Sequence, residues 1–96
     1  STSIFVLSST ANLWKAMSYA QNELLESERA KSTLPVSLSQ GEFELDHPMN
    51  GFRWKRVIRD TTPLTGIEVR QVNYQLSWSE GKHEYTYDAD IYVNPN

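Results

Sequence analysis

The spacing of apolar residues changes at Pro35, and this change limits the folds that the chain can adopt. Before it, apolar residues recur in steps of four, three and four, at Leu13, Met17, Ala20 and Leu24. That spacing places them on one face of a helix. Proline lacks an N–H group and biases the residue before it away from helical geometry. The sequence therefore predicts one amphipathic helix over about residues 10–31, with Ser9, Thr10 or Asn12 as its cap.

After Pro35, apolar and polar residues alternate, which is the pattern of half-buried strands. Two oppositely charged segments, about 41–46 and 52–59, flank a predicted turn at 48–51 and read as a hairpin. One register matches every cross-strand pair in character. The predicted pairs are Leu45 with Phe52, Phe43 with Trp54, Glu44 with Arg53 and Glu42 with Lys55.

Two further strands are predicted, over about residues 66–79 and 82–93. The apolar positions of the first change from odd to even, which predicts a bulge near Arg70-Gln71. A two-residue turn at Glu80-Gly81 then joins the strands, with Leu76 facing Tyr85, Tyr74 facing Tyr87 and Val72 facing Ala89. We expect a single α+β domain over residues 1–96, with one long N-terminal helix packed on a four-stranded antiparallel sheet at about 41–93.

Composition excludes several classes of protein. The chain of 96 residues has no cysteine, so a disulfide framework, a cysteine-based zinc site and a cysteine nucleophile are ruled out. The net charge of −3 argues against a nucleic-acid partner, because such domains normally carry a basic excess. A basic cluster interrupts this acidity, but most of its side chains and the neighbouring aromatic residues occupy opposite strand faces. The cluster consists of Arg53, Lys55, Arg56 and Arg59.

Residues that could carry chemistry are sparse. The candidate metal ligands form only two-residue fragments, which are Asp46 with His47, His83 with Glu84, and Asp88 with Asp90. No serine lies in a Gly-x-Ser-x-Gly motif, and no glycine-rich phosphate loop is present. We therefore expect no enzymatic activity, no cofactor and no metal.

A second row of residues on the predicted helix is the clearest indication of function. Trp14 and Leu25 lie roughly 100° around the helix from the first apolar face, so one sheet cannot easily cover both. Either the sheet curls over Trp14, or this aromatic residue is exposed, or a partner binds there. The candidate partner-binding residues are Trp14, Ser18, Gln21 and Leu25, which we call the outer helix row.

Four segments carry a resemblance to a known family. They are residues 13–24 (LWKAMSYAQNEL), 51–57 (GFRWKRV), 66–72 (GIEVRQV) and 76–78 (LSW). Together they resemble type IV pilin-like proteins, and most of all the I-type minor pseudopilin of bacterial type II secretion. That family shows an Ala-rich amphipathic helix, a Gly-x-x-Trp-x-x-x-Val strand and a following strand of the Leu-x-x-Val-x-Val-x-Val-x-Trp kind.

The resemblance implies the periplasmic domain of a bacterial protein anchored in the inner membrane. Such a subunit joins the J- and K-type minor pseudopilins at the tip of the pseudopilus, where it initiates assembly and supports protein export. Precursors of this family carry a prepilin cleavage site and an apolar helix, and neither is present here. We expect a membrane-spanning segment to precede Ser1, with residues 4–7 (IFVL) as its last part.

Two alternatives stay open at this point. A minor pilin of a type IV pilus or of a competence system would share the predicted fold and differ in its assembly partners. An unrelated small binding module would instead use the curved sheet to hold a ligand between Trp54, Trp78 and the tyrosines.

Overall fold

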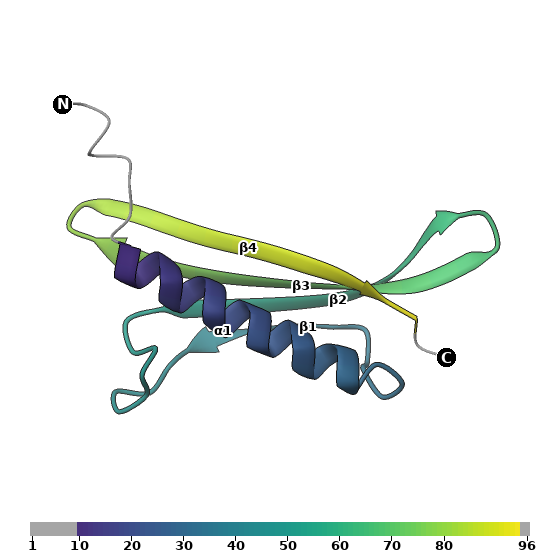
Figure 1. Ribbon diagram of the computed structural model, residues 1–96, viewed down its shortest axis with the longest axis horizontal. Coiled ribbons are helices and arrows are strands. Elements are labelled where there is room, and N and C mark those ends of the chain that lie inside the picture. Colours follow the sequence, from purple (N-terminus) through teal and green to yellow (C-terminus); the bar gives the residue numbers. More distant parts are fainter. Residues whose placement is uncertain (1–9, 95–96) are drawn as a thin grey trace.

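The computed structural model describes residues 10–94 of the chain, apart from the side chains of residues 63 and 64. One helix packs on one antiparallel sheet whose strands follow chain order, β1-β2-β3-β4 (Figure 1). The elements are α1 (Thr10–Arg29), β1 (Ser37–Glu42), β2 (Arg53–Leu64), β3 (Ile67–Glu80) and β4 (His83–Val93). The predicted α+β class and the antiparallel order of four strands are confirmed. Residues 4–7 and the candidate cap Ser9 lie outside the described residues.

The helix buries a face slightly different from the predicted one. Its buried residues are Ala16, Ala20, Leu24 and Ser27. Leu13 is 39% exposed, so its predicted place in the core is wrong. The two alanines are fully buried, and their small side chains let the helix backbone lie close to the sheet. Buried Ser27 is satisfied because its hydroxyl donates to the Glu23 carbonyl at 3.0 Å.

The first strand lies earlier in the chain than predicted. β1 ends at Glu42, and residues 43–52 form a longer connection closed by backbone hydrogen bonds such as that from His47 to the Glu44 carbonyl. In the observed register Gly41 lies opposite Trp54 and Glu42 opposite Arg53, a shift of two residues. The predicted pairs of Phe43, Glu44 and Leu45 are therefore wrong.

The β3–β4 hairpin is also shifted by two residues. Glu80 pairs with His83, so the turn residues are Gly81 and Lys82, and Gly81 has the positive φ of 63° that a type II′ turn requires. The observed pairs are Leu76 with Tyr87, Tyr74 with Ala89 and Val72 with Ile91. A shift of two residues leaves every side chain on its predicted face of the sheet. The alternation therefore predicted the inward-facing residues correctly although the register was wrong.

The predicted bulge at Arg70-Gln71 is wrong as well. Pairing of β3 with β4 is continuous from Arg70 onward, and the irregularity lies in β2, between Thr61 and Leu64. Ile67 is 48% exposed because this end of the β2–β3 hairpin extends past the end of the helix (Figure 1).

The core lies between α1 and the β3–β4 half of the sheet. α1 packs on β3 and β4, and the largest fully buried side chains are Ile58, Val72 and Leu76. The other sheet face is open and carries a polar ladder in which Asn73 and Gln75 both donate to Asp88. Within residues 10–94, no helix is both long enough and apolar enough to cross a membrane.

Candidate functional site

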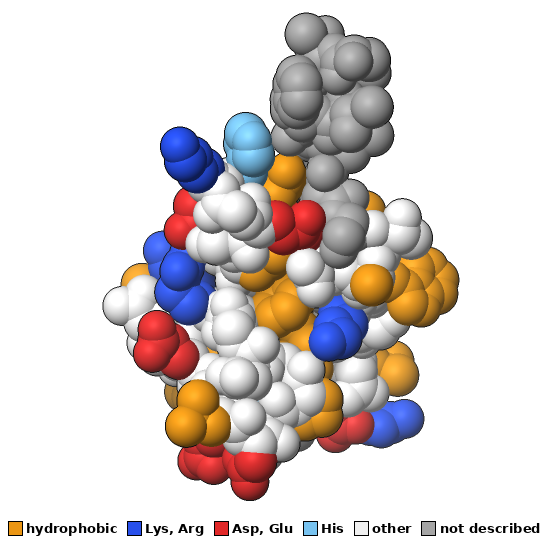
Figure 2. Space-filling model, turned by 90° about the vertical axis from the view of Figure 1, so that its left-hand side faces the viewer, with side chains coloured by type: hydrophobic (Ala, Val, Ile, Leu, Met, Phe, Trp, Pro, Cys, Tyr) orange, Lys and Arg blue, Asp and Glu red, His pale blue; other side chains and the backbone are white. Residues whose placement is uncertain are grey.

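The outer helix row faces away from the sheet. All four of its residues are exposed, with Trp14 at 66% and Leu25 at 52% of their full accessible surface. The sheet therefore does not curl over Trp14. Figure 2 views the end of the molecule where the helix begins, and hydrophobic side chains protrude there at one rim.

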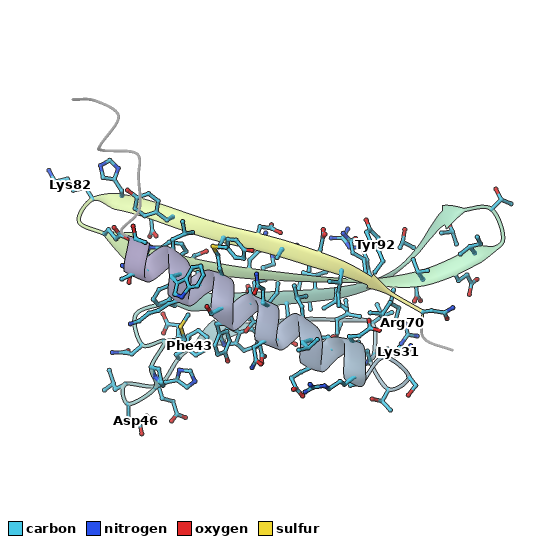
Figure 3. The ribbon with its side chains drawn as sticks, viewed as in Figure 1. Lys31, Phe43, Asp46, Arg70, Lys82 and Tyr92 are labelled. Atoms are coloured by element: carbon cyan, nitrogen blue, oxygen red, sulfur yellow. The ribbon has the colours of Figure 1, made fainter. Side chains whose placement is uncertain are left out.

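An apolar groove continues this row onto the sheet. It has a volume of about 340 Å³ and runs between Leu24 and Leu25 of the helix and Ile91 and Tyr92 of β4. Tyr92 is 59% exposed and lies near the far end of β4 (Figure 3). The helix and the neighbouring strand thus present one connected surface with apolar side chains.

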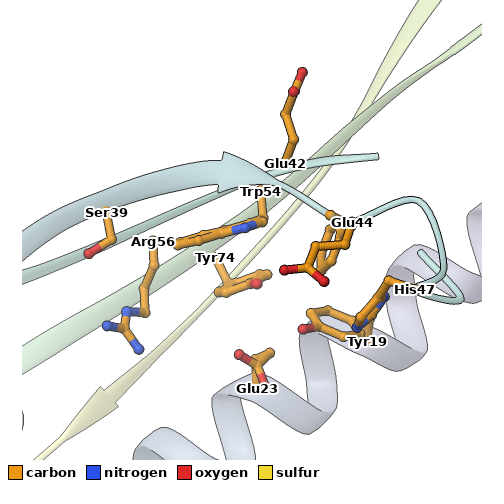
Figure 4. Close-up of a pocket in the computed structure, with 10 residues that line it drawn as sticks. Tyr19, Glu23, Ser39, Glu42, Glu44, His47, Trp54, Arg56 and Tyr74 are labelled. Carbon is orange, nitrogen blue, oxygen red and sulfur yellow. The ribbon is translucent and has the colours of Figure 1, made fainter. Parts of the chain in front are cut away.

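A second hollow lies on the other flank of the helix, and we call it the aromatic pocket. It forms because α1 covers β3 and β4 and leaves a space between its own flank and β1–β2. Its volume is about 500 Å³, within the range of small-molecule sites. The lining residues are Tyr19, Glu23, Ser39, Glu42, Phe43, Glu44, His47, Trp54, Arg56 and Tyr74 (Figure 4).

Aromatic rings form two walls of this pocket. Trp54 and Tyr74 are nearly parallel, with ring centroids 6.3 Å apart and planes 7° from parallel. Phe43 meets Tyr19 edge to face at 5.1 Å. Gly41 makes room for the indole, because a Cβ at this position would lie 3.3 Å from three atoms of Trp54. The cross-strand neighbour of Trp54 is therefore a residue without a side chain.

The two tyrosine hydroxyls in the pocket keep their protons at neutral pH. Burial raises the pKa of Tyr74 well above its ordinary value, and the nearby negative charges of Tyr19, when ionised, and Glu23 raise it further. Burial and then Glu23 also raise the pKa of Tyr19. Both side chains can therefore donate hydrogen bonds inside the pocket.

Unpaired charges of both signs line the aromatic pocket. Burial aside, the Glu23 carboxylate is close enough to Tyr19 to raise its pKa, and Figure 4 shows Glu44 on the same side of the pocket and the Arg56 guanidinium on the opposite side. In the part of the chain that the structure describes, Arg56 Nε is the one buried side-chain nitrogen or oxygen without a hydrogen-bond partner. Such an orphaned donor costs about 1–3 kcal/mol.

The remaining charged pairs lie elsewhere. Among the described residues the ion pairs are Arg29 with Glu26, Lys31 with Glu28, Arg53 with Glu84 and Arg70 with Asp60. None of them involves a charged residue of the aromatic pocket.

The predicted metal fragments have other contacts. Asp90 accepts a hydrogen bond from Gln71 at 3.0 Å, and His47 Nδ1 accepts one from the Met49 amide at 2.9 Å. His47 also packs against Phe43, with ring centroids 4.8 Å apart. Over residues 10–94, no three histidine, aspartate or glutamate side chains are close enough to hold a metal ion.

Sequence reasoning found part of this pocket. The ligand-binding alternative named Trp54 and the tyrosines, and Trp54 and Tyr74 do line the pocket. Trp78 does not, because it is 2% exposed and its indole N–H donates to Glu80 at 2.8 Å. Arg56 was missed, although it is the basic residue of its segment that shares the parity of Trp54.

Tyr19 and Glu23 were missed as well. They stand four residues apart and so share one flank of the helix.

Comparison of the chain with models of known protein families, with curated proteins and with solved structures finds no match.

Proposed function

We propose that this chain is the globular domain of an I-type minor pseudopilin of type II secretion. In this role the outer helix row binds neighbouring pseudopilin subunits of the J and K types, which supports fibre assembly and protein export. Support comes from the resemblance in residues 13–24, 51–57, 66–72 and 76–78 and from the packing of one helix on an antiparallel sheet. The observation that carries the proposal is the exposure of Trp14 and Leu25 on the outward face of that helix.

The outer helix row has the composition of a helix-packing surface. Trp14 supplies a large apolar area of a kind enriched in interface hot spots. Ser18 and Gln21 lie between the two apolar anchors and are polar. A helix of a neighbouring subunit could pack along this row in a ridges-into-grooves arrangement. The apolar groove beside Leu25 would lengthen the contact toward Tyr92.

Capture of neighbouring subunits tests this proposal. Purified J- and K-type pseudopilins from the same organism are immobilised and presented with the wild-type chain, Trp14→Ala or Leu25→Asp. We expect either substitution to reduce capture about tenfold or more, because each removes an apolar anchor of the interface. Melting temperatures should stay close to that of the wild type, since both side chains are largely exposed.

The matched control is Leu45→Asp. Leu45 is 89% exposed and lies on the connection between β1 and β2, away from the outer helix row. Capture of this variant should equal that of the wild type. Unchanged capture by Trp14→Ala and Leu25→Asp would contradict the proposed interface. A large drop in their melting temperatures would instead assign the two side chains to the core.

The coding sequence upstream of Ser1 provides a separate test of the assignment to a family. A prepilin cleavage site followed by an apolar segment of about 20 residues would support it. An initiator methionine directly before Ser1 would refute it.

A further inference from the structure

We propose that the aromatic pocket binds a small zwitterionic ligand, with its ammonium group between Glu23 and Glu44 and its anionic group on Arg56. This inference goes beyond the proposed role in fibre assembly. It uses the flank of α1 that faces β1 and β2, whereas the outer helix row faces away from the sheet. Failure of one proposal therefore leaves the other testable.

The cationic end of the ligand is defined by two carboxylates and the aromatic walls. Glu23 comes from the helix and Glu44 from the connection after β1, and both line the pocket on the side of Tyr19 (Figure 4). Neither carboxylate takes part in an ion pair of the described residues. The faces of Trp54 and Tyr74 add the negative ring potential that attracts ammonium groups, especially methylated ones.

The anionic end of the ligand is defined by Arg56. Arg56 lines the pocket, and Figure 4 shows its guanidinium on the side away from Tyr19. The terminal nitrogens of this guanidinium can donate to a carboxylate or phosphate oxygen of a ligand. Arg56 forms no ion pair among the described residues, so a ligand would be its first anionic partner.

Both charges are needed because the pocket suits neither a simple anion nor a simple cation. Glu23 and Glu44 would repel an anion placed in the same cavity as Arg56. A lone cation would be repelled by the positive charge of Arg56 in the same pocket. A zwitterion matches the separation of opposite charges along the pocket that Figure 4 shows.

The probes are amino acids of increasing length. NMR titration of the isotope-labelled chain, following the indole N–H of Trp54, compares unbranched ω-amino acids from glycine to ε-aminocaproate. Each is tested beside the amine and the carboxylic acid of the same length. We expect at least one amino acid to bind about tenfold or more tightly than its two singly charged analogues. Trimethylation of its ammonium group should tighten binding further.

Variants assign the two ends of the ligand. Arg56→Gln should remove the preference for the amino acid over the amine, because only the anionic end is lost. Combined substitution of Glu23→Gln and Glu44→Gln should remove the preference over the acid. Glu42→Gln is the matched control, since it removes the same charge, but Figure 4 shows its side chain pointing away from the other two carboxylates. This control should bind like the wild type.

Three results would overturn the proposal. The first is that no amino acid of the series binds more tightly than both of its singly charged analogues. The second is that Glu42→Gln weakens binding as much as the double substitution, which would indicate only a diffuse acidic surface. The third is that binding leaves the Trp54 indole signal unchanged while other regions respond. Backbone amide spectra of every variant check that the fold is retained.

Discussion

Glu80 connects the start of the helix to the end of β3, and its removal should destabilise the domain. One oxygen, Glu80 Oε2, accepts hydrogen bonds from Trp78 Nε1 at 2.8 Å and from Asn12 Nδ2 at 3.0 Å. Asn12, which the sequence offered as a candidate helix cap, thus lies within α1. Its side chain contacts Glu80, which is 68 residues later in the chain. The contact fixes where α1 begins on the sheet.

The magnitude follows from the burial of the two donors. Trp78 is 2% exposed, so the loss of the Glu80 acceptor for its indole N–H in Glu80→Ala should cost about 1–3 kcal/mol. Asn12 is half-buried and can be hydrated, so the loss of its bond adds about 0.5–1.5 kcal/mol. We expect Glu80→Ala to lower the free energy of unfolding by about 2–3 kcal/mol. Glu80→Gln retains an acceptor oxygen and should cost about 1 kcal/mol.

Urea denaturation followed by circular dichroism measures this difference. With a slope of about 1–3 kcal/mol per molar urea, the midpoint for Glu80→Ala should fall by about 0.7–3 M. Glu84→Ala is the control, because Glu84 forms only an exposed pair with Arg53 at 3.0 Å and should cost about 0–1 kcal/mol. If Glu80→Ala is no more destabilising than this control, the proposed connection does not stabilise the fold.

Three further predictions concern the core, a turn and alkaline pH. Leu76→Ala should cost about 2–5 kcal/mol in urea denaturation because Leu76 is fully buried, and a cost below about 1 kcal/mol would contradict its central position. Gly81→Val should cost about 1–2 kcal/mol because valine is strained at a φ of 63°, whereas Gly81→Asn should cost less; equal melting temperatures for both variants would refute this reasoning. Tyr74 keeps its proton in the folded state above its ordinary pKa of 10.0, so its contribution to stability should be lost as pH rises above that value, by up to about 1.4 kcal/mol per pH unit. Tyr74→Phe should make this alkaline decline less steep in denaturation measured at several pH values, and an unchanged slope would be the contrary result.

The sequence predicted the elements of the fold better than their register. Alternation identified the inward face of each strand, and a helical period identified the helix. Alternation repeats every two residues, however, so it cannot distinguish the observed pairing of Leu76 with Tyr87 from one shifted by two. The turn chemistry at Gly81 decides between the two registers. A type II′ turn has glycine at its first central position, and the prediction placed Gly81 at the second.

Most of the aromatic pocket could not be predicted from the sequence, for a different physical reason. Its residues come from the helix, three strands and a connection, and they meet only because α1 packs toward one side of the sheet. The spacing of apolar residues along the sequence does not determine over which strands the helix packs. Ala16 and Ala20 are fully buried in the helix that packs on β3 and β4, and their small side chains allow this close packing.

The order of the strands has a consequence for how quickly the chain can fold. Each strand pairs with the next one along the chain, so the sheet can form by successive closure of hairpins, and the β2–β3 and β3–β4 turns are only two residues long. The helix is made first in the chain, yet the strands that it covers, β3 and β4, come last. The largest loss of chain entropy is therefore associated with helix docking. A partially folded sheet would expose Val72 and Leu76 until that step is complete.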